Sequence, residues 1–335
     1  MKRVLCFGEI LLRYSMGENF PEKQAMNAFV GGAESNVALA LAKWHVPVKY
    51  STAMPDNFLS EKIIAFYQKM GVDTSTIIKS GKRIGSYYLS QGADVKNEGV
   101  IYDREHSAFS ELKPSFIDWE EVLKDVGWFH FTAISPALNS NLALLCEEAL
   151  SAASKKGITI SIDLNFREKL WKYGSDPIDV IPKLARYANV IMGNIWAAEK
   201  MLGISISKTA NLDTDEDLLA EAENSSKSII DRYPNCHTVA NTFRFSEGEG
   251  VKYFATLYSE SHFYKSKTFF TEKTIDKVGT GDCFMAGIIY GMLQEDKPQQ
   301  IIEFAKAAAC QKFFIKGDAT TSESKEILEL IQKDE

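Results

Sequence analysis

The chain has 335 residues, of which 45% are hydrophobic and 25% are charged. This balance is typical of a packed globular protein and excludes a disordered, a collagen-like or a small disulfide-stapled chain. The 38 basic and 45 acidic residues give a net charge of −7, which argues against general nucleic-acid binding because such a surface repels a phosphate backbone.

Short apolar runs rich in β-branched residues alternate with helical patterns along most of the chain. The expected strands are Arg3–Phe7, Lys49–Ala53, Trp128–Phe131, Ile158–Asp163, Val190–Gly193 and Thr238–Ala240. The expected helices are Ser35–Lys43, Ser60–Met70, Asn141–Lys155, Leu212–Ser226, Asp282–Leu293 and Ile302–Phe314. This alternation predicts an α/β fold with a parallel sheet that is covered by helices on both faces.

Two segments, Glu9–Val30 and Arg83–Tyr102, interrupt the alternation. Each contains alternating, aromatic-bearing stretches separated by polar or glycine turns, which is typical of antiparallel strands. Since both flank a βα unit of the main layer, we expect insertions at about residues 10–30 and 83–103 to form a small β lid. Exposed edges of such a sheet favour pairing with another copy of the chain, so we expect a homo-oligomer through the lid.

The cysteines and the apolar runs predict the compartment. The five cysteines are widely separated and form no C-x-x-C pair, which fits a reducing environment. The apolar run Val4–Phe7 is too short for a signal peptide, and no stretch has the length of a membrane span. We therefore expect a cytoplasmic protein with no membrane partner. The five histidines show no metal-ligand spacing, and we assign no metal ligand among the side chains.

The strongest local motif runs from Asp276 to Gly287, with the sequence DKVGTGDCFMAG. Gly279 and Gly281 let the backbone turn tightly around Thr280 just before a helix, so N–H groups and the helix dipole converge on one anion site. Asp282 is well placed to accept a proton from a hydroxyl that attacks a bound phosphoryl group. Alone, the motif is equally consistent with an aspartate N-cap after a glycine turn.

A second motif is the glycine pair Gly31 and Gly32, which leads into a helix that contains Asn36. Backbone exposed at the glycines can bind substrate hydroxyls, and Asn36 offers a donor and an acceptor one turn later. Ordinary turn chemistry explains this motif equally well when it is taken alone.

Together and in this order, the two motifs resemble the paired signatures of the ribokinase-like (PfkB) family of carbohydrate kinases. The resemblance covers nearly the whole chain and implies one domain over residues 1–335: a three-layer α/β/α, doubly wound, mostly parallel sheet with a small β lid. It implies transfer of the γ-phosphoryl group of ATP to a sugar hydroxyl, with Asp282 as catalytic base. The N–H groups of Gly279, Thr280 and Gly281 would form the anion hole. The implied cofactors are ATP and Mg²⁺, and the need for a monovalent cation stays open.

Two arginines suggest the kind of sugar. Arg104 follows the second lid segment, and Arg167 follows Asp163 and Asn165 at period two, which places the three on one face if strand geometry continues. Two guanidinium groups suggest a carboxylate ligand, because a neutral sugar offers no equal match to the guanidinium fork. Each arginine can instead pair with an acidic neighbour in the sequence: Asp103, Glu105 or Glu168.

The segments that contain Arg104 and Arg167, together with Gly8–Arg13 and Ile134–Leu138, are similar to the 2-keto-3-deoxygluconate kinase branch of the family. The resemblance implies that the two arginines and a lid tyrosine bind the keto acid, whose terminal hydroxyl is phosphorylated to give 2-keto-3-deoxy-6-phosphogluconate. We expect Tyr87 in this role, with Tyr88 and Tyr102 as alternatives, although lid tyrosines can also simply pack the lid. Two other readings stay open: a kinase for a neutral sugar such as fructose or ribose, and a catalytically weak sugar-binding protein.

The expected nucleotide site departs from the family pattern. Many members have N-x-x-E after the strand that ends here at Gly193, but in this chain Asn194 is followed by Ala197 where the glutamate stands. The usual glycine-bearing nucleotide loop is degenerate around residues 240–244. Thr242 and Arg244 can still face phosphate there, beside Gly279 and Gly281. Residues 308–312 are expected either to line an adenine pocket or to pack in the core.

Overall fold

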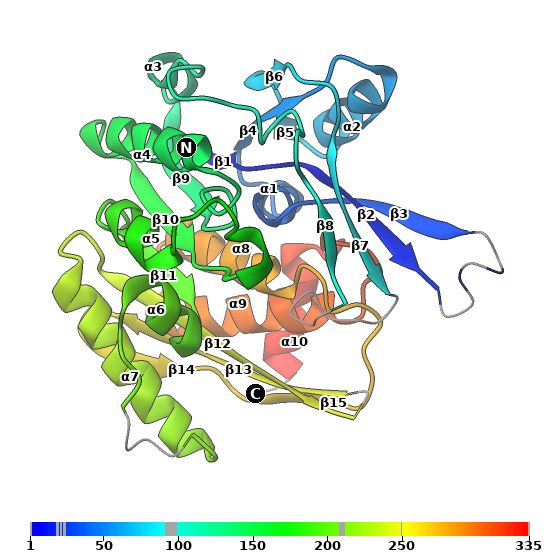
Figure 1. Ribbon diagram of the computed structural model, residues 1–335. Helices are drawn as coiled ribbons and strands as arrows, with labels where there is room; N and C mark the ends of the chain where they lie inside the picture. Colours follow the sequence, from blue (N-terminus) through cyan, green and yellow to red (C-terminus); the bar gives the residue numbers. More distant parts are fainter. Residues whose placement is uncertain are drawn as a thin grey trace.

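Two sheets organise the chain in this computed structural model, which describes residues 2–17, 20, 22, 25–90, 99–207, 212–248 and 250–333. Within these residues the main sheet has 11 strands and a separate sheet has four (Figure 1). The main-sheet strands are β1 (Arg3–Phe7), β4 (Val48–Met54), β5 (Val72–Asp73), β6 (Ile77–Lys79), β9 (Val126–Thr132), β10 (Thr159–Asp163), β11 (Val190–Gly193), β12 (Thr238–Glu247), β13 (Gly250–Ser259), β14 (His262–Lys265) and β15 (Phe269–Thr271).

The main sheet is mostly parallel. Strands β12, β11, β10, β9, β1, β4 and β5 lie side by side in this order and run in the same direction. Beyond β12, the strands β13, β14 and β15 add an antiparallel edge. The strand order reverses at β1, where β4 lies on one side and β9 on the other. In open α/β sheets, ligands bind beyond the carboxyl ends of the strands at such a switch point.

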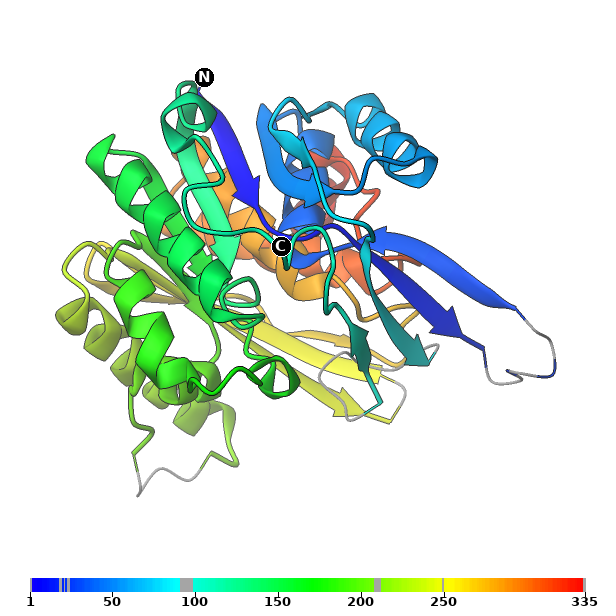
Figure 2. The ribbon, with the colours of Figure 1, turned by 45° about the horizontal axis from the view of Figure 1, so that its top comes forward.

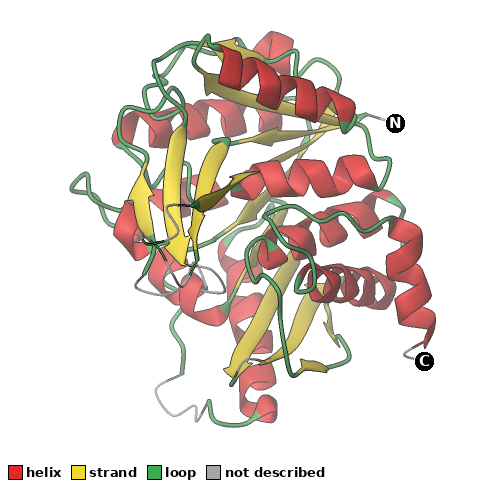
Figure 3. Cartoon of the chain, turned by 90° about the vertical axis from the view of Figure 1, so that its right-hand side faces the viewer, coloured by secondary structure: helices red, strands yellow, loops and turns green. Residues whose placement is uncertain are grey.

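Helices pack on both faces of the main sheet (Figures 1 and 3). Along β1, Val4 and Cys6 belong to the hydrophobic core on one face, and Leu5 and Phe7 belong to the core on the other. The first core is completed by α1 (Ala33–Lys43), α2 (Phe58–Lys69), α8 (Thr280–Leu293), α9 (Pro298–Lys312) and α10 (Ser324–Lys333). The second is completed by α3 (Trp119–Val122), α4 (Ser140–Lys155), α5 (Pro177–Ala185), α6 (Ile195–Leu202) and α7 (Asp215–Arg232). This arrangement confirms the expected three-layer, doubly wound fold.

The small sheet has the strand order β3-β2-β7-β8 and comes from the two segments that interrupt the alternation. Its strands are β2 (Leu11–Met16), β3 (Met26–Gly31), β7 (Gly85–Ser90) and β8 (Ile101–Asp103), and β2 and β3 extend away from the main sheet (Figure 2). The pairs β2–β3 and β7–β8 are antiparallel as expected, but β2–β7 is parallel, so the all-antiparallel expectation was wrong. Both strands begin at the root of the lid, where Leu11 pairs with Gly85, and therefore run outward together.

The strand expected at Thr238–Ala240 is longer than its apolar core suggested. It continues as β12 to Glu247 and pairs with β13 along its whole length, so the segment expected as a nucleotide loop is a strand. The alternation of Thr242 and Arg244 with the buried Phe243 accounts for the strand, because period two places them on opposite faces. Among the described residues, no helix is long and apolar enough to cross a membrane.

Candidate active site

The lid and the carboxyl ends of the central strands enclose a cavity of about 600 Å³. It brings together nearly all the residues singled out from the sequence: Gly32, Asn36, Tyr87, Tyr102, Arg104, Arg167, Asn194, Thr242, Arg244, Gly279, Thr280, Gly281 and Asp282. Gly31 is not among the lining residues. A side chain there would place a Cβ 2.2 Å from Oδ2 of Asp318, which gives Gly31 a packing reason to be glycine.

Asp282 lies in the first turn of α8 at the base of the cavity. Its Oδ2 accepts a hydrogen bond of 2.7 Å from Nδ2 of Asn36, which lies on α1. Desolvation raises the pKa of Asp282 to about 8, and the nearby carboxylate of Asp163 acts in the same direction. The Asn36 hydrogen bond and the Arg167 charge oppose this rise. A carboxyl group with its pKa near the working pH is suited to take up and release a proton.

The turn before α8 has the backbone geometry of an anion site. Gly279 precedes α8 in the left-handed conformation, with φ of 79°, and a Cβ there would lie 1.8 Å from the carbonyl oxygen of Asp318. Only glycine therefore fits. The first N–H groups of a helix have no carbonyl partner within that helix, and Gly279, Thr280 and Gly281 line the cavity. Their donors can accordingly receive a phosphoryl group.

Arg244 on β12 braces this turn. Its Nη1 donates to Oγ1 of Thr280 at 3.1 Å and to the carbonyl oxygen of Lys277 at 3.4 Å, and the Thr280 hydroxyl donates to the same carbonyl at 3.1 Å. The sequence suggested a phosphate-facing role for Arg244 but gave no sign of this contact. The cationic side chain thus lines the cavity and also fixes the loop beside the anion site.

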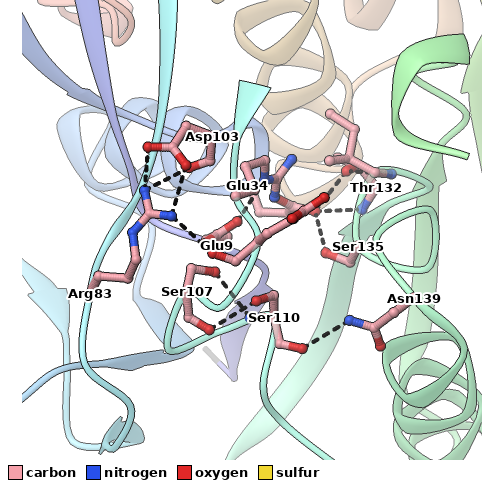
Figure 4. A network of polar contacts seen from close by, with 12 residues as sticks. Glu9, Glu34, Arg83, Asp103, Ser107, Ser110, Thr132, Ser135 and Asn139 are labelled. Carbon is pink, nitrogen blue, oxygen red and sulfur yellow. Dashed lines mark hydrogen bonds and ion pairs between the residues drawn. The ribbon is translucent and has the colours of Figure 1, made fainter. Parts of the chain in front are cut away.

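Arg104 makes an ion pair that the sequence did not suggest. Its Nε donates to Oε2 of Glu9 at 2.6 Å, and both side chains are buried. Asp103 pairs instead with Arg83, through two contacts of 2.6 and 2.8 Å (Figure 4). Within the described residues, the side-chain hydrogen bonds and ion pairs of Arg104 involve only Nε. The two terminal nitrogens of a residue that lines the cavity are therefore left for a ligand.

Arg167, the second arginine expected to bind the substrate, lies beyond the end of the strand that precedes it. Strand β10 ends at Asp163, and Asn165 has a positive φ of 29°, so the period-two expectation was wrong. The chain turns across the end of the sheet instead, and Asp163, Asn165 and Arg167 still all line the cavity. Arg167 donates through Nη1 to the carbonyl oxygen of Phe166 at 2.9 Å, and no ion pair joins it to Glu168 in the described chain.

A buried charge network behind the lid was missed in the sequence. The hydroxyl of Tyr87 donates to Oδ2 of Asp318 at 2.7 Å, so the tyrosine expected to bind substrate is held by an acid. Arg13 of β2 donates through Nε to Asp318 at 2.7 Å and through Nη2 to Asp276 at 2.6 Å. Asp276 precedes the anion-site turn. The lid is thus tied directly to the loop that carries the turn.

A second buried carboxylate lies within the glycine-pair motif. Oε1 of Glu34 accepts hydrogen bonds from the backbone N–H of Thr132 at 3.0 Å, from its hydroxyl at 2.7 Å and from the hydroxyl of Ser135 at 3.3 Å (Figure 4). Burial raises the pKa of Glu34, and the hydrogen bonds from Thr132 oppose the rise. The carboxylate thereby joins the start of α1 to the end of β9.

The nucleotide side of the cavity is only partly as expected. Asn194 is the N-cap of α6, where Oδ1 accepts from the N–H of Ala197 at 2.8 Å, and both residues line the cavity. Trp196, Lys200 and Lys277 line it as well, although the sequence had not singled them out. Residues 308–312 do not line it. All of them except the half-buried Gln311 are buried in the core, because this end of α9 lies against α8 and the main sheet.

The acidic groups of the cavity fit Mg²⁺ that arrives with a nucleotide. This ion keeps several waters and is usually bound by one or two carboxylates plus substrate phosphates. Asp163 and Asp282 line the cavity near the anion site, and the described residues contain no cluster of three or more His, Cys, Asp or Glu side chains. Asp163 would contact the ion together with phosphate oxygens and waters, which leaves the Asp282 carboxyl free to accept and release a proton.

Comparison with known proteins gives consistent relatives. A family model described as pfkB family carbohydrate kinase matches residues 1–325. A 2-dehydro-3-deoxygalactonokinase of Haloferax volcanii is 27% identical over 317 residues, which cover 94% of this chain and 92% of the relative. A 2-dehydro-3-deoxygluconokinase of Bacillus subtilis is 25% identical over 315 residues, with 93% and 90% covered. The crystal structure of a 2-dehydro-3-deoxygluconokinase from Thermotoga maritima is 35% identical and has a TM-score of 0.89, covering 99% of this chain and 100% of the other.

Proposed function

The chain belongs to the PfkB family of carbohydrate kinases, and on that premise we propose that it phosphorylates a small sugar acid with ATP. The proposed substrate is 2-keto-3-deoxygluconate, and the proposed product is 2-keto-3-deoxy-6-phosphogluconate. The observation that carries this choice is the pair of guanidinium groups, Arg104 and Arg167, in the cavity that also holds Asp282. Guanidinium groups match the geometry of a carboxylate, which a neutral sugar lacks. The relatives of Bacillus subtilis and Thermotoga maritima, named for this activity, support it.

The proposed reaction begins with the placement of the sugar acid. Glu9 orients Arg104 through Nε, so its terminal nitrogens can bind the carboxylate, and Arg167 binds it from the end of β10. The buried Oδ1 of Asn36 has no hydrogen-bond partner among the described residues and can accept from a sugar hydroxyl, beside the backbone of Gly32. Tyr102 completes the wall on the lid side. Such positioning supplies a large part of the barrier reduction in phosphoryl transfer.

Asp282 then accepts the proton of the attacking hydroxyl. The N–H groups of Gly279, Thr280 and Gly281 stabilise charge on the transferring phosphoryl group, while Arg244, Thr242 and Asn194 face the nucleotide. Mg²⁺, when bound with the nucleotide, neutralises phosphate charge. The lid excludes water that would otherwise hydrolyse ATP.

The test is an ADP-release assay with a panel of acceptors. It compares 2-keto-3-deoxygluconate, its 4-epimer 2-keto-3-deoxygalactonate, fructose and ribose. The epimer is included because the Haloferax volcanii relative is named for it. Preference for fructose or ribose would favour the neutral-sugar reading. Sugar binding without turnover of any acceptor would favour a binding protein. Replacing K⁺ with tetramethylammonium in the same assay decides whether a monovalent cation is required.

Arginine variants test the carboxylate clamp. Arg104→Ala and Arg167→Ala should each lower kcat/KM for the keto acid by about 10- to 100-fold, since a hydrogen bond to a charged group contributes about 1.5–3 kcal/mol. Arg83→Ala is the matched control, because Arg83 pairs with Asp103 near the lid and does not line the cavity. Unchanged kcat/KM in both cavity variants would refute the clamp.

We further propose that the chain works as one domain in the cytoplasm and assembles through its lid. All five cysteines are buried and free, which suits a reducing compartment. Strand β3 is an edge of the small sheet, and Met26, Asn27 and Ala28 on it are exposed. Light scattering coupled to size exclusion should find a dimer or larger assembly, which Ala28→Lys weakens. A monomer at every concentration would contradict the proposal.

A further inference from the structure

Lys312, the last residue of α9, is a lysine with no solvent exposure. Its Nζ donates to the carbonyl oxygen of Ile315 at 2.8 Å. Lysine side chains are almost never fully buried unless they are paired. Lys312 does not line the cavity, so binding of substrate or nucleotide does not explain its charge.

The charges around Lys312 are balanced. Asp276 and Asp318 are buried and favour its positive form, whereas Arg13, which pairs with both acids, disfavours it. Two cations and two carboxylates, all buried, are thus coupled in one cluster, in which only Arg13 makes ion pairs among the described residues. Burial lowers the pKa of Lys312, and the two carboxylates oppose that change. Loss of one member of such a cluster leaves a buried charge without compensation.

The cluster lies directly behind the anion site. Asp276 accepts hydrogen bonds from the N–H of Val278 at 3.0 Å and from the N–H of Gly317 at 3.1 Å. The carbonyl oxygen of Phe313 accepts from the N–H groups of Ile275 and Asp276 at 2.8 and 3.1 Å. Segment 275–278, which leads into the anion-site turn, is therefore joined to segment 313–318, which follows Lys312.

A further contact joins the start of α8 to α9, the helix that ends at Lys312. The Lys312 charge acts on the thiol of Cys283, the residue after Asp282, and Cys283 Sγ also donates to the carbonyl oxygen of Ala308 on α9 at 3.3 Å. The end of α9 that carries Lys312 is thus joined to the first turn of α8, and its ammonium is bound to segment 313–318 through Ile315.

We propose that the Lys312 ammonium is a built-in cation that positions the anion hole. It holds segments 275–278 and 313–318 together, so that the N–H groups of residues 279–281 point into the cavity. A dissolved monovalent cation is then not needed for turnover. The proposal rests on phosphoryl transfer at this site but not on the identity of the sugar.

Two substitutions distinguish the effect of removing the Lys312 charge from the effect of opening space for a dissolved cation. Lys312→Met removes the charge and keeps most of the stem, so it leaves no room for an ion. Lys312→Ala removes the charge and opens space beside the carbonyl oxygen of Ile315, where the ammonium is bound. Both should lower kcat by about 10- to 100-fold, the size of effect expected from a misplaced catalytic group. KM for the sugar should change less, because Arg104 and Arg167 are untouched.

Cation rescue is the decisive readout. Ammonium, methylammonium or K⁺ should restore part of the turnover of Lys312→Ala and raise its melting temperature, whereas tetramethylammonium should do neither. Lys312→Met and the wild type should not respond. Lys306→Ala is the matched control, because Lys306 is also buried on α9 but pairs with Glu303 at 3.4 Å. The melting temperature needs no substrate, so this result stays informative if the proposed sugar is wrong.

Three outcomes would overturn the proposal. The first is a wild-type enzyme that requires K⁺. The second is a Lys312→Met enzyme with normal turnover. The third is a Lys312→Ala protein that stays inactive or unfolded in every cation.

Discussion

The pKa of Asp282 sets the pH at which the proposed base becomes available. Only the carboxylate can accept a proton, and desolvation raises its pKa to about 8. About one tenth of the molecules are then ionised at pH 7 and about nine tenths at pH 9. Since kcat/KM reports the ionisation of the free enzyme, it should rise about tenfold between these pH values and level off above them.

The pH range over which kcat/KM rises is the limb of the pH profile. Two charges that neighbour Asp282 predict the direction in which this limb shifts along the pH axis. Asp163→Asn removes a like charge, so the pKa of Asp282 falls and the limb moves to lower pH. Arg167→Gln removes an opposite charge, so the limb moves to higher pH. Both side chains also line the cavity, and both variants therefore lower the plateau. The position of the limb, and not its height, is the quantity compared.

The assay measures ADP release from pH 6 to pH 10 at saturating MgATP and varied sugar acid. Asp282→Asn, expected to lose about 10²-fold or more in turnover, shows which part of the profile comes from the substrates. A flat profile, or a limb near the ordinary carboxyl pKa, would refute the desolvated base. A limb near pH 8 that persists in Asp282→Asn would assign the titration to another group.

Three further predictions concern stability and the anion-site turn. The pKa of Asp282 is raised from 3.8, so the folded state binds the extra proton and the free energy of unfolding falls as pH rises from about 4 to 8. In Asp282→Asn, the free energy of unfolding measured with urea should not show this decrease with pH. An equal decrease in the variant and in the wild type would contradict the prediction. Gly279→Ala should lower the melting temperature and should reduce turnover by at least tenfold, because the new Cβ would clash with the backbone of Asp318. In Gly281→Ala the nearest atom is 4.0 Å away, so thermal scans should show a nearly unchanged melting temperature. Thr214→Ala removes the N-cap hydroxyl that accepts from the N–H of Asp217 and should cost about 1 kcal/mol in urea unfolding, with turnover unchanged.

Most of the fold could be predicted because buried parallel strands have a simple sequence pattern. Both faces of β1 and of β11 meet a hydrophobic core, so each strand is a continuous apolar run between helical segments. The pattern fails at β12. There Thr242 and Arg244 face the cavity and interrupt the apolar run, although the strand continues to Glu247. A strand that serves a polar site thus has the composition of a loop.

The small sheet shows a different limit. Alternating aromatic residues predicted its strands, but alternation depends only on the two faces of a strand and is the same in either direction. The parallel pairing of β2 with β7 follows from where the two insertions leave the main sheet, and that is a property of the whole topology. Direction therefore could not be predicted from the local pattern.

Charged partners were the least predictable part of the site. Glycine turns and a helix start identify the anion site because they are local in sequence, and Asp282 follows from them. Arg104, by contrast, pairs with Glu9 and not with an adjacent acid, and Asp103, the last residue of β8, pairs with Arg83 instead. Desolvation then makes the distant partner necessary, because a buried guanidinium without a carboxylate is unstable.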